Sequence, residues 1–180
     1  MRRAATAILL FFLAVPLRAL AGGAGFWLDV PFVRQTKNGC GAACISMVMR
    51  YWEKPSGAVA PAAADPRRIL RDLYVAPARG IYAAAMERYF RQNGFAVYVF
   101  RGNRRNLAHH LSKGRPLIVG LAPGGRAGPL HYVVVTGIDP AQNVVMVNDP
   151  ARRKLLKLDW PTLKKSWKAT GNWTLLALPQ

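Results

Sequence analysis

The sequence predicts one α+β domain in which helices come first and an antiparallel sheet follows. Helical patterns lie before residue 114, most strand-like segments lie after residue 115, and short links join those strands. A parallel sheet would instead need a crossover helix between successive strands. With 180 residues, 52% of them hydrophobic, the chain is long and apolar enough to bury one domain core.

The N-terminal half of the domain contains the helical patterns. Phe26 to Val33 indicates an extended segment held straight by Pro31. Asn38 is an N-cap candidate for a helix from Gly39 to Trp52. After it we expect a Pro/Ala-rich connector over 55–66, helices over 67–74 and 81–92, a strand over 95–100 and a helix from Asn103 to Lys113. Asp65-Pro66 supplies the N-cap and first residue of the second helix.

The C-terminal half is predicted to form the sheet. His131 to Ile138 is rich in β-branched residues and follows a Gly/Pro-rich loop over 122–129. The link over 139–143 is hairpin-like, so we expect the strand over 144–147 to pair with the strand before it. The remaining predicted elements are strands over 116–121, 155–158 and 173–178, and a short helical stretch over 160–167.

The first 21 residues have the pattern of an export signal. Arg2 and Arg3 precede the apolar run from Ala4 to Val15, and Ala19-Leu20-Ala21 forms an A-x-A cleavage site. The run is shorter than the roughly 20 residues of a spanning helix. We therefore expect a signal peptide over 1–21, a mature domain over 22–180 and export to the periplasm or the medium, with an uncleaved membrane anchor as the alternative.

The chain is strongly basic, with a net charge of +18. Removing the three arginines of the leader, which contains no acidic residue, leaves +15 on the mature domain. Such a charge favours anionic partners, such as an acidic peptide or a membrane surface, although a solvated basic surface with no such role is the alternative. Nothing in the sequence has the spacing of a zinc finger, an RNA-binding motif or a phosphate-binding loop. We expect a monomer that needs no nucleic acid, metal or cofactor.

Cys40 is the candidate nucleophile. It stands at the predicted start of the first helix, where unpaired amides and the helix dipole favour a thiolate. An isolated cysteine is more often a buried packing residue, but Gln35 lies five residues upstream. A side-chain amide beside the backbone N–H of the nucleophile can form an oxyanion hole.

A thiolate nucleophile needs a base, and the chain has three histidines. His109 and His110 lie in a basic helical pattern and are expected to be surface residues. His131 begins a strand directly after a loop, where scaffolds present reactive groups. Asp149, at the end of the neighbouring strand, is expected to face His131 and fix its tautomer, in preference to Asp139 at the far end of the His131 strand.

Several segments in the same order resemble the double-glycine leader peptidases, which are bacteriocin-processing cysteine peptidases with a papain-like fold. The segments that carry the resemblance are Val30-Pro31-Phe32, Gln35, Cys40-Gly41-Ala42-Ala43, Met47, His131 to Gly137, and Asn148-Asp149-Pro150. The resemblance runs over nearly all of the mature chain. It implies a helix bearing Cys40 packed on an antiparallel sheet, with Gln35 in the oxyanion hole, Cys40 as nucleophile, His131 as base and Asp149 as its orienting partner.

The chain departs from the best-known members of that family in two ways. Gly39 precedes the cysteine where those members have Asp. Those members are cytoplasmic domains fused to ATP-driven exporters that cut after Gly-Gly, whereas here an export signal is predicted and ATP use is not expected. The specificity for double-glycine sites is therefore open.

The expected function is a thiol peptidase acting on an exported peptide or protein. Two alternatives are a papain-like module that binds peptides without cutting them, and a thiol amidase or acyltransferase that shares the acyl-enzyme but differs in the acceptor. The full set of four site residues argues against a pure binding module.

Cys44, the second cysteine, lies one helical turn after Cys40. Residues so spaced have Cα atoms about 6 Å apart, within the range for a disulfide, although a bridge inside one turn would be strained. A packing role is the simpler interpretation. A redox bridge that holds the exported enzyme inactive is the alternative hypothesis.

Overall fold

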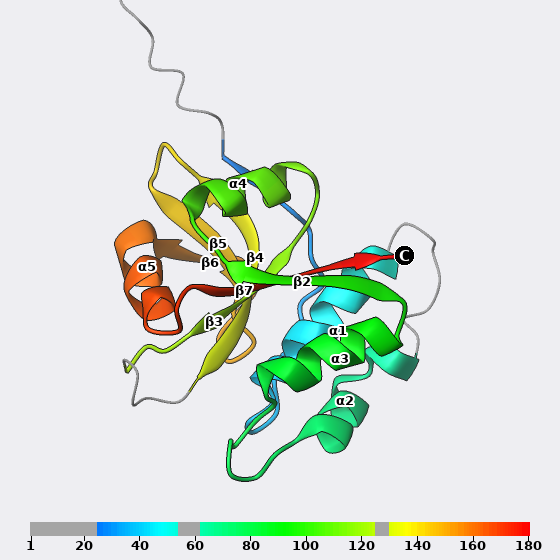
Figure 1. The fold of residues 1–180 in the computed structure, drawn as a ribbon. Helices are drawn as coiled ribbons and strands as arrows, with labels where there is room; N and C mark the ends of the chain where they lie inside the picture. Colours follow the sequence, from blue (N-terminus) through cyan, green and yellow to red (C-terminus); the bar gives the residue numbers. More distant parts are fainter. Residues whose placement is uncertain (1–24, 54–61, 125–129) are drawn as a thin grey trace, which may run out of the picture.

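The computed structural model describes residues 25–53, 62–124 and 130–180 (Figure 1). The expected signal peptide over 1–21 lies outside these ranges, as do most of the Pro/Ala-rich connector and the end of the loop over 122–129. Within the described ranges, every helix is too short or too polar to cross a bilayer.

The domain is built around one antiparallel sheet. Its strands are β1 Phe26–Trp27, β2 Phe95–Arg101, β3 Leu117–Leu121, β4 His131–Asp139, β5 Val144–Asn148, β6 Leu156–Asp159 and β7 Trp173–Pro179. The order is β2-β7-β3-β4-β5-β6, with β1 paired to β4, and each of these pairings is antiparallel. The predicted α+β class with an antiparallel sheet is confirmed.

Helices cover both faces of the sheet (Figure 1). The helices are α1 Cys40–Glu53, α2 Pro66–Leu73, α3 Ala83–Gln92, α4 Arg104–Ser112 and α5 Trp160–Lys168, with a short 3₁₀ turn at Ala62–Ala64. The first three pack on one face and the last two on the other.

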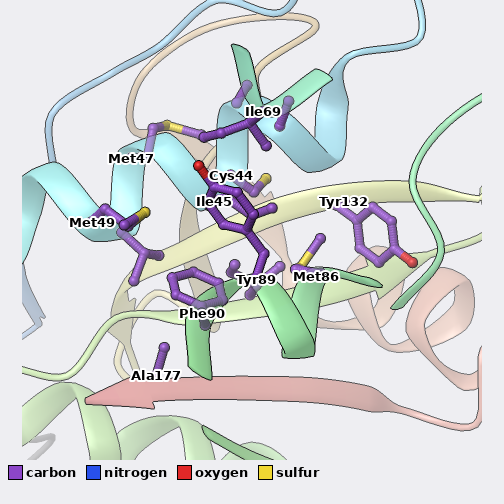
Figure 2. Packing of buried hydrophobic residues seen from close by; sticks show 14 of the residues in the cluster. Cys44, Ile45, Met47, Met49, Ile69, Met86, Tyr89, Phe90, Tyr132 and Ala177 are labelled. Atoms are coloured by element: carbon purple, nitrogen blue, oxygen red, sulfur yellow. The ribbon is translucent and has the colours of Figure 1, made fainter. Parts of the chain in front are cut away.

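Alternation along the strands builds these two cores. Ile118 and Val134 point to the α1 face, whereas Val119 and Val133 point to the face covered by α4 and α5. On the α1 face, all residues of α1 from 41 to 49 are buried, because the helix lies between the sheet and the other two helices (Figure 2). A helix enclosed in this way holds its first residue, Cys40, in a fixed position.

The turn before α1 differs from the prediction by one residue. The helix begins at Cys40, and Asn38 does not cap it, because Asn38 has a left-handed φ of 59° and its amide donates to the Tyr74 hydroxyl at 3.4 Å. Asn tolerates this conformation better than most residues do. Gly39 closes the turn with an N–H bond to Thr36 O at 3.0 Å, and a Cβ there would come within 3.1 Å of the same oxygen.

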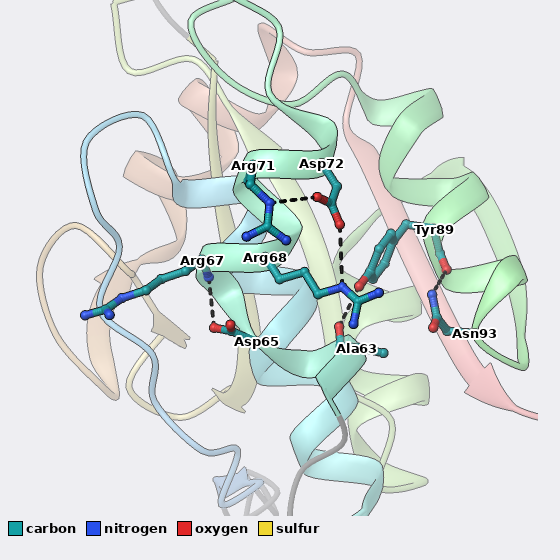
Figure 3. A network of polar contacts seen from close by, with 8 residues as sticks. All are labelled: Ala63, Asp65, Arg67, Arg68, Arg71, Asp72, Tyr89 and Asn93. Atoms are coloured by element: carbon teal, nitrogen blue, oxygen red, sulfur yellow. Dashed lines mark hydrogen bonds and ion pairs between the residues drawn. The ribbon is translucent and has the colours of Figure 1, made fainter.

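Helix α2 begins as the sequence predicted. Asp65 accepts from the Arg67 N–H at 3.1 Å, and Pro66 is the first helical residue. Figure 3 shows this cap beside the ion pair between Arg68 and Asp72, 3.6 Å apart.

Two other predicted segments are corrected in detail. Of the extended segment over 26–33, only Phe26 and Trp27 join the sheet, because the chain then turns away toward α1. The helix expected from Ile81 begins at Ala83, and Tyr82 is its N-cap.

Candidate active site

The first turn of α1 and the first residue of β4 meet at one end of the sheet. Cys40, half-buried, begins the helix, and His131, also half-buried, begins the strand beside β3. Both line a cleft of about 570 Å³, together with Gln35, Asn38 and Leu130. The structure thus brings Cys40, His131 and Gln35 to one cavity.

The His131 imidazole contacts a carboxylate through its Nε2 atom. Its Nε2 lies 2.8 Å from Asp149 Oδ1, and that oxygen also accepts from the Ala151 N–H at 3.0 Å. Asp139 lies at the opposite end of β4, where it accepts from the Gln142 N–H. Asp149, rather than Asp139, is therefore the carboxylate beside His131, as the sequence predicted.

The remaining nitrogen of the imidazole, Nδ1, is left for Cys40, which forms a hydrogen bond with His131. Burial opposes ionisation of the thiol, but this bond, backbone bonds from Tyr132 and Gly41 and the positive charge of His131 outweigh it and hold the pKa of Cys40 below its usual value. The Gly41 amide belongs to the first turn of α1, so the helix end stabilises the thiolate.

His131 is shifted in the opposite direction. Burial lowers the pKa of its imidazole, but hydrogen bonds to Asp149 and Cys40, with their charges, raise it to about 9. Burial likewise raises the pKa of Asp149, while its bonds to His131 and Ala151 hold the pKa of that carboxyl below its usual range. A lowered thiol pKa beside a raised imidazole pKa favours a thiolate–imidazolium pair.

A buried asparagine holds the Asp149 segment in place. Asn148 is fully buried, its amide nitrogen donates to Val30 O at 3.1 Å, and its side-chain oxygen accepts from the Leu155 N–H at 3.0 Å. It thereby ties the end of β5 to the N-terminal segment and closes the turn that follows Asp149. The Asn148-Asp149-Pro150 motif did not indicate this role, because the contact with Val30 joins segments 118 residues apart in the chain.

The same turn fixes Gln35. The Gln35 N–H donates to Pro150 O at 3.0 Å, which places the side chain at the wall of the cleft. Its side-chain oxygen is buried with no protein partner. A side-chain amide beside Cys40, close to the amides of the first helical turn, can stabilise an oxyanion.

The other two histidines and the second cysteine lie away from this cleft. His109 and His110 are on α4, on the opposite face of the sheet from α1, and their rings contact each other. His109 is exposed and His110 is half-buried. Cys44 is fully buried in the α1 core and is a free thiol, which favours its packing role.

The described residues contain no group of three His, Cys, Asp or Glu side chains close enough to hold a metal ion. The chemistry available in the cleft is that of a thiolate, an imidazole, a carboxylate and backbone and side-chain amides.

Comparison with known proteins assigns the chain to a family. Residues 27–175 match the model of the Peptidase C39-like family, so the chain belongs to that family. This is the family that the sequence motifs resembled. A comparison with curated proteins finds no match.

Solved structures similar to this chain include proteins described as peptidases or peptidase domains. A Bacillus anthracis protein described as a C39-like peptidase has a TM-score of 0.67 at 16% identity, over 88% of this chain and 99% of that one. A double-glycine motif protease of an AMS/PCAT transporter, solved with its leader peptide, has a TM-score of 0.61 at 21% identity, over 86% and 94%. The peptidase domain of Streptococcus ComA, an ABC transporter of a quorum-sensing pathway, has 0.62 at 20%, over 83% and 98%.

Proposed function

We propose that this chain is a cysteine peptidase that hydrolyses peptide bonds of an exported peptide or protein. The observation that carries the proposal is the row of contacts from Cys40 to His131 to Asp149 at the edge of an open cleft. A cysteine that serves only in packing does not require a lowered pKa, a half-buried imidazole beside it and a carboxylate behind that imidazole.

The proposed reaction has two halves. In the first, the Cys40 thiolate attacks the scissile carbonyl, whose developing oxyanion is stabilised by the Gln35 side chain and the Cys40 N–H. His131 then gives its proton to the leaving amine. In the second, His131 takes a proton from water, which attacks the thioester and releases the acyl product. Asp149 keeps the imidazole in the required tautomer and orientation throughout.

The substrate class has two supports. The family is a peptidase family, and one solved relative contains a bound leader peptide, which favours an extended peptide as the substrate. Export of the enzyme, and therefore of its substrate, is proposed from the pattern of Arg2-Arg3, an apolar run and Ala19-Leu20-Ala21.

The test is mass-spectrometric profiling of the mature chain on a peptide library. We expect Cys40→Ala to abolish cleavage without unfolding the protein, and Gln35→Ala to lower kcat by about 10²- to 10³-fold with little change in KM. Full cleavage by Cys40→Ala would refute the assignment.

The same profiling separates the alternatives. Peptide binding without cleavage by the wild-type chain would indicate a binding module. Transfer of the acyl group to an added amine in preference to water would indicate an acyltransferase.

A further inference from the structure

A second cavity borders the catalytic cleft at His131. This cavity has a volume of about 400 Å³ and shares His131 and Pro123 with the cleft. Cys40 and Gln35 line the cleft but not the second cavity, whereas Asp149 lines the second cavity but not the cleft. The second cavity is therefore the one that a peptide extending from the nucleophile past His131 would reach.

The chemistry assigns the second cavity to one side of the scissile bond. During cleavage the acyl part of the substrate stays bound to Cys40, while the leaving nitrogen must lie within reach of His131 to receive a proton. The residues that follow the scissile bond therefore begin at His131. Because the second cavity lies beyond His131 from Cys40, it accommodates the leaving segment.

The walls of the cavity come from the sheet and from α5. Leu121 and Leu158 form apolar surfaces, and the N–H of Ala122 donates to Ser166 O at 3.0 Å, which joins the end of β3 to the helix. The walls of the cavity are therefore part of the folded scaffold.

The charge of the cavity is positive. Its cationic lining residues, Arg152 and Lys165, are both exposed. The charge of Arg152 helps to lower the pKa of Asp149, whereas Lys165 forms no ion pair with an acidic residue of the described chain. Its one acidic lining residue, Asp149, is already paired with His131. Helix α5 itself, from Trp160 to Lys168, contains no acidic residue.

We infer that this cavity binds a carboxylate of the substrate on the leaving side of the scissile bond. The inference rests on the proposed peptidase function. A net positive charge beside an apolar wall selects an anionic group on a peptide over a neutral one. The carboxylate can come from an Asp or Glu side chain shortly after the cleaved bond, or from the C-terminus of a short leaving segment.

The experiment compares peptides with one fixed acyl segment. The first pair has Glu or Gln in the two positions after the scissile bond and an amidated end. The second pair has neutral residues there and ends in a free carboxylate or an amide. The ratio of kcat/KM within each pair is measured for the wild type, for Lys165→Gln and for the matched control Lys164→Gln, which removes a neighbouring charge outside the cavity.

We expect the wild type to prefer the carboxylate in at least one pair by about three- to tenfold, the size of one or two solvent-exposed charge pairs. The pair that shows the preference identifies the source of the carboxylate. Lys165→Gln should reduce the preference at least twofold, and Lys164→Gln should retain it. Equal rates within both pairs, or an undiminished preference in Lys165→Gln, would overturn the inference.

Two further measurements separate this inference from the peptidase proposal. A peptidyl aminomethylcoumarin amide has no residue after the scissile bond, so its cleavage reports the peptidase alone. If no substrate is cleaved, fluorescence anisotropy with the same peptides, labelled at the acyl end and bound to Cys40→Ala, gives the carboxylate preference directly. Tighter binding of the carboxylate peptides that Lys165→Gln weakens and Lys164→Gln leaves unchanged would support the subsite, and equal binding would overturn it.

Discussion

At the scale of single residues, the ionisation of Cys40 and His131 is one linked property. The thiolate needs the imidazolium, and the imidazolium needs the thiolate and Asp149, so the two groups titrate as a unit. The pair exists above the lowered pKa of Cys40 and below the His131 pKa of about 9.

Activity should therefore have a bell-shaped dependence on pH. It falls on the acid side as the thiolate takes up a proton, and on the alkaline side near pH 9 as His131 loses its proton. Asp149→Asn removes a hydrogen bond and a charge that raise the pKa of His131, so its alkaline limb should move to lower pH and its kcat should fall. Profiles of kcat/KM against pH measure both effects, with Asp139→Asn as the control that should match the wild type.

The two cysteines should differ sharply in reactivity. Burial raises the pKa of Cys44 well above its usual value, and its side chain is fully buried, whereas Cys40 has a lowered pKa and lines the cleft. Iodoacetamide at neutral pH should therefore modify Cys40 alone in the folded protein, and both cysteines after unfolding. Peptide mapping by mass spectrometry reads the sites. A Cys40–Cys44 disulfide in protein isolated without reductant would instead support the redox hypothesis.

The sequence alone pointed to Cys40, His131 and Asp149 as one candidate site, because each stands at the predicted end of an element, and the structure places the three side chains side by side. The sequence did not indicate that Asn148 holds the Asp149 turn in place, or that the Tyr132 backbone N–H donates to the Cys40 thiol. Both roles depend on contacts between segments that are remote in the chain, which local patterns do not record.

At the scale of elements, the end of β5 is the part that holds the site together. Asn148 bonds to Val30 O and to the Leu155 N–H, and the turn that follows carries Asp149 and the carbonyl that anchors Gln35. The caps and ends of helices were largely predictable, because capping uses neighbouring residues, as at Asp65 and Asn103. The one-residue error at α1 arose because Asn38 takes a left-handed turn instead of a cap.

Asn148→Ala should lower both stability and activity. The change leaves the Val30 carbonyl and the Leu155 N–H without their hydrogen-bond partner. An unsatisfied buried group costs about 1–3 kcal/mol of stability. Urea unfolding gives the loss of stability, and kcat per folded molecule gives the loss of positioning of Asp149 and Gln35. In the control Asn106→Ala, which breaks the capping box of α4, stability should fall by about 1 kcal/mol while kcat is retained. If Asn148→Ala retains the same kcat per folded molecule as Asn106→Ala, Asn148 has no role in positioning Asp149 and Gln35.

At the scale of the whole molecule, one sheet separates two cores and presents the site at its end. The hairpins β3-β4-β5-β6 follow the chain order and were predictable from their short links. The place of β7 between β2 and β3 was not, because a strand that returns over more than 50 residues leaves no local signal.

The net positive charge, +15 without the expected leader, is a property of the whole molecule. Long-range attraction of an acidic peptide to so basic a protein raises the rate of encounter, and salt screens it within about 8 Å at physiological ionic strength. The kcat/KM for an acidic peptide should therefore fall as sodium chloride is raised, whereas a neutral peptide of the same length should change little. Stopped or continuous fluorescence assays on matched Glu and Gln peptides measure both. The same salt dependence for the two peptides would mean that the charge serves solubility and has no part in substrate capture.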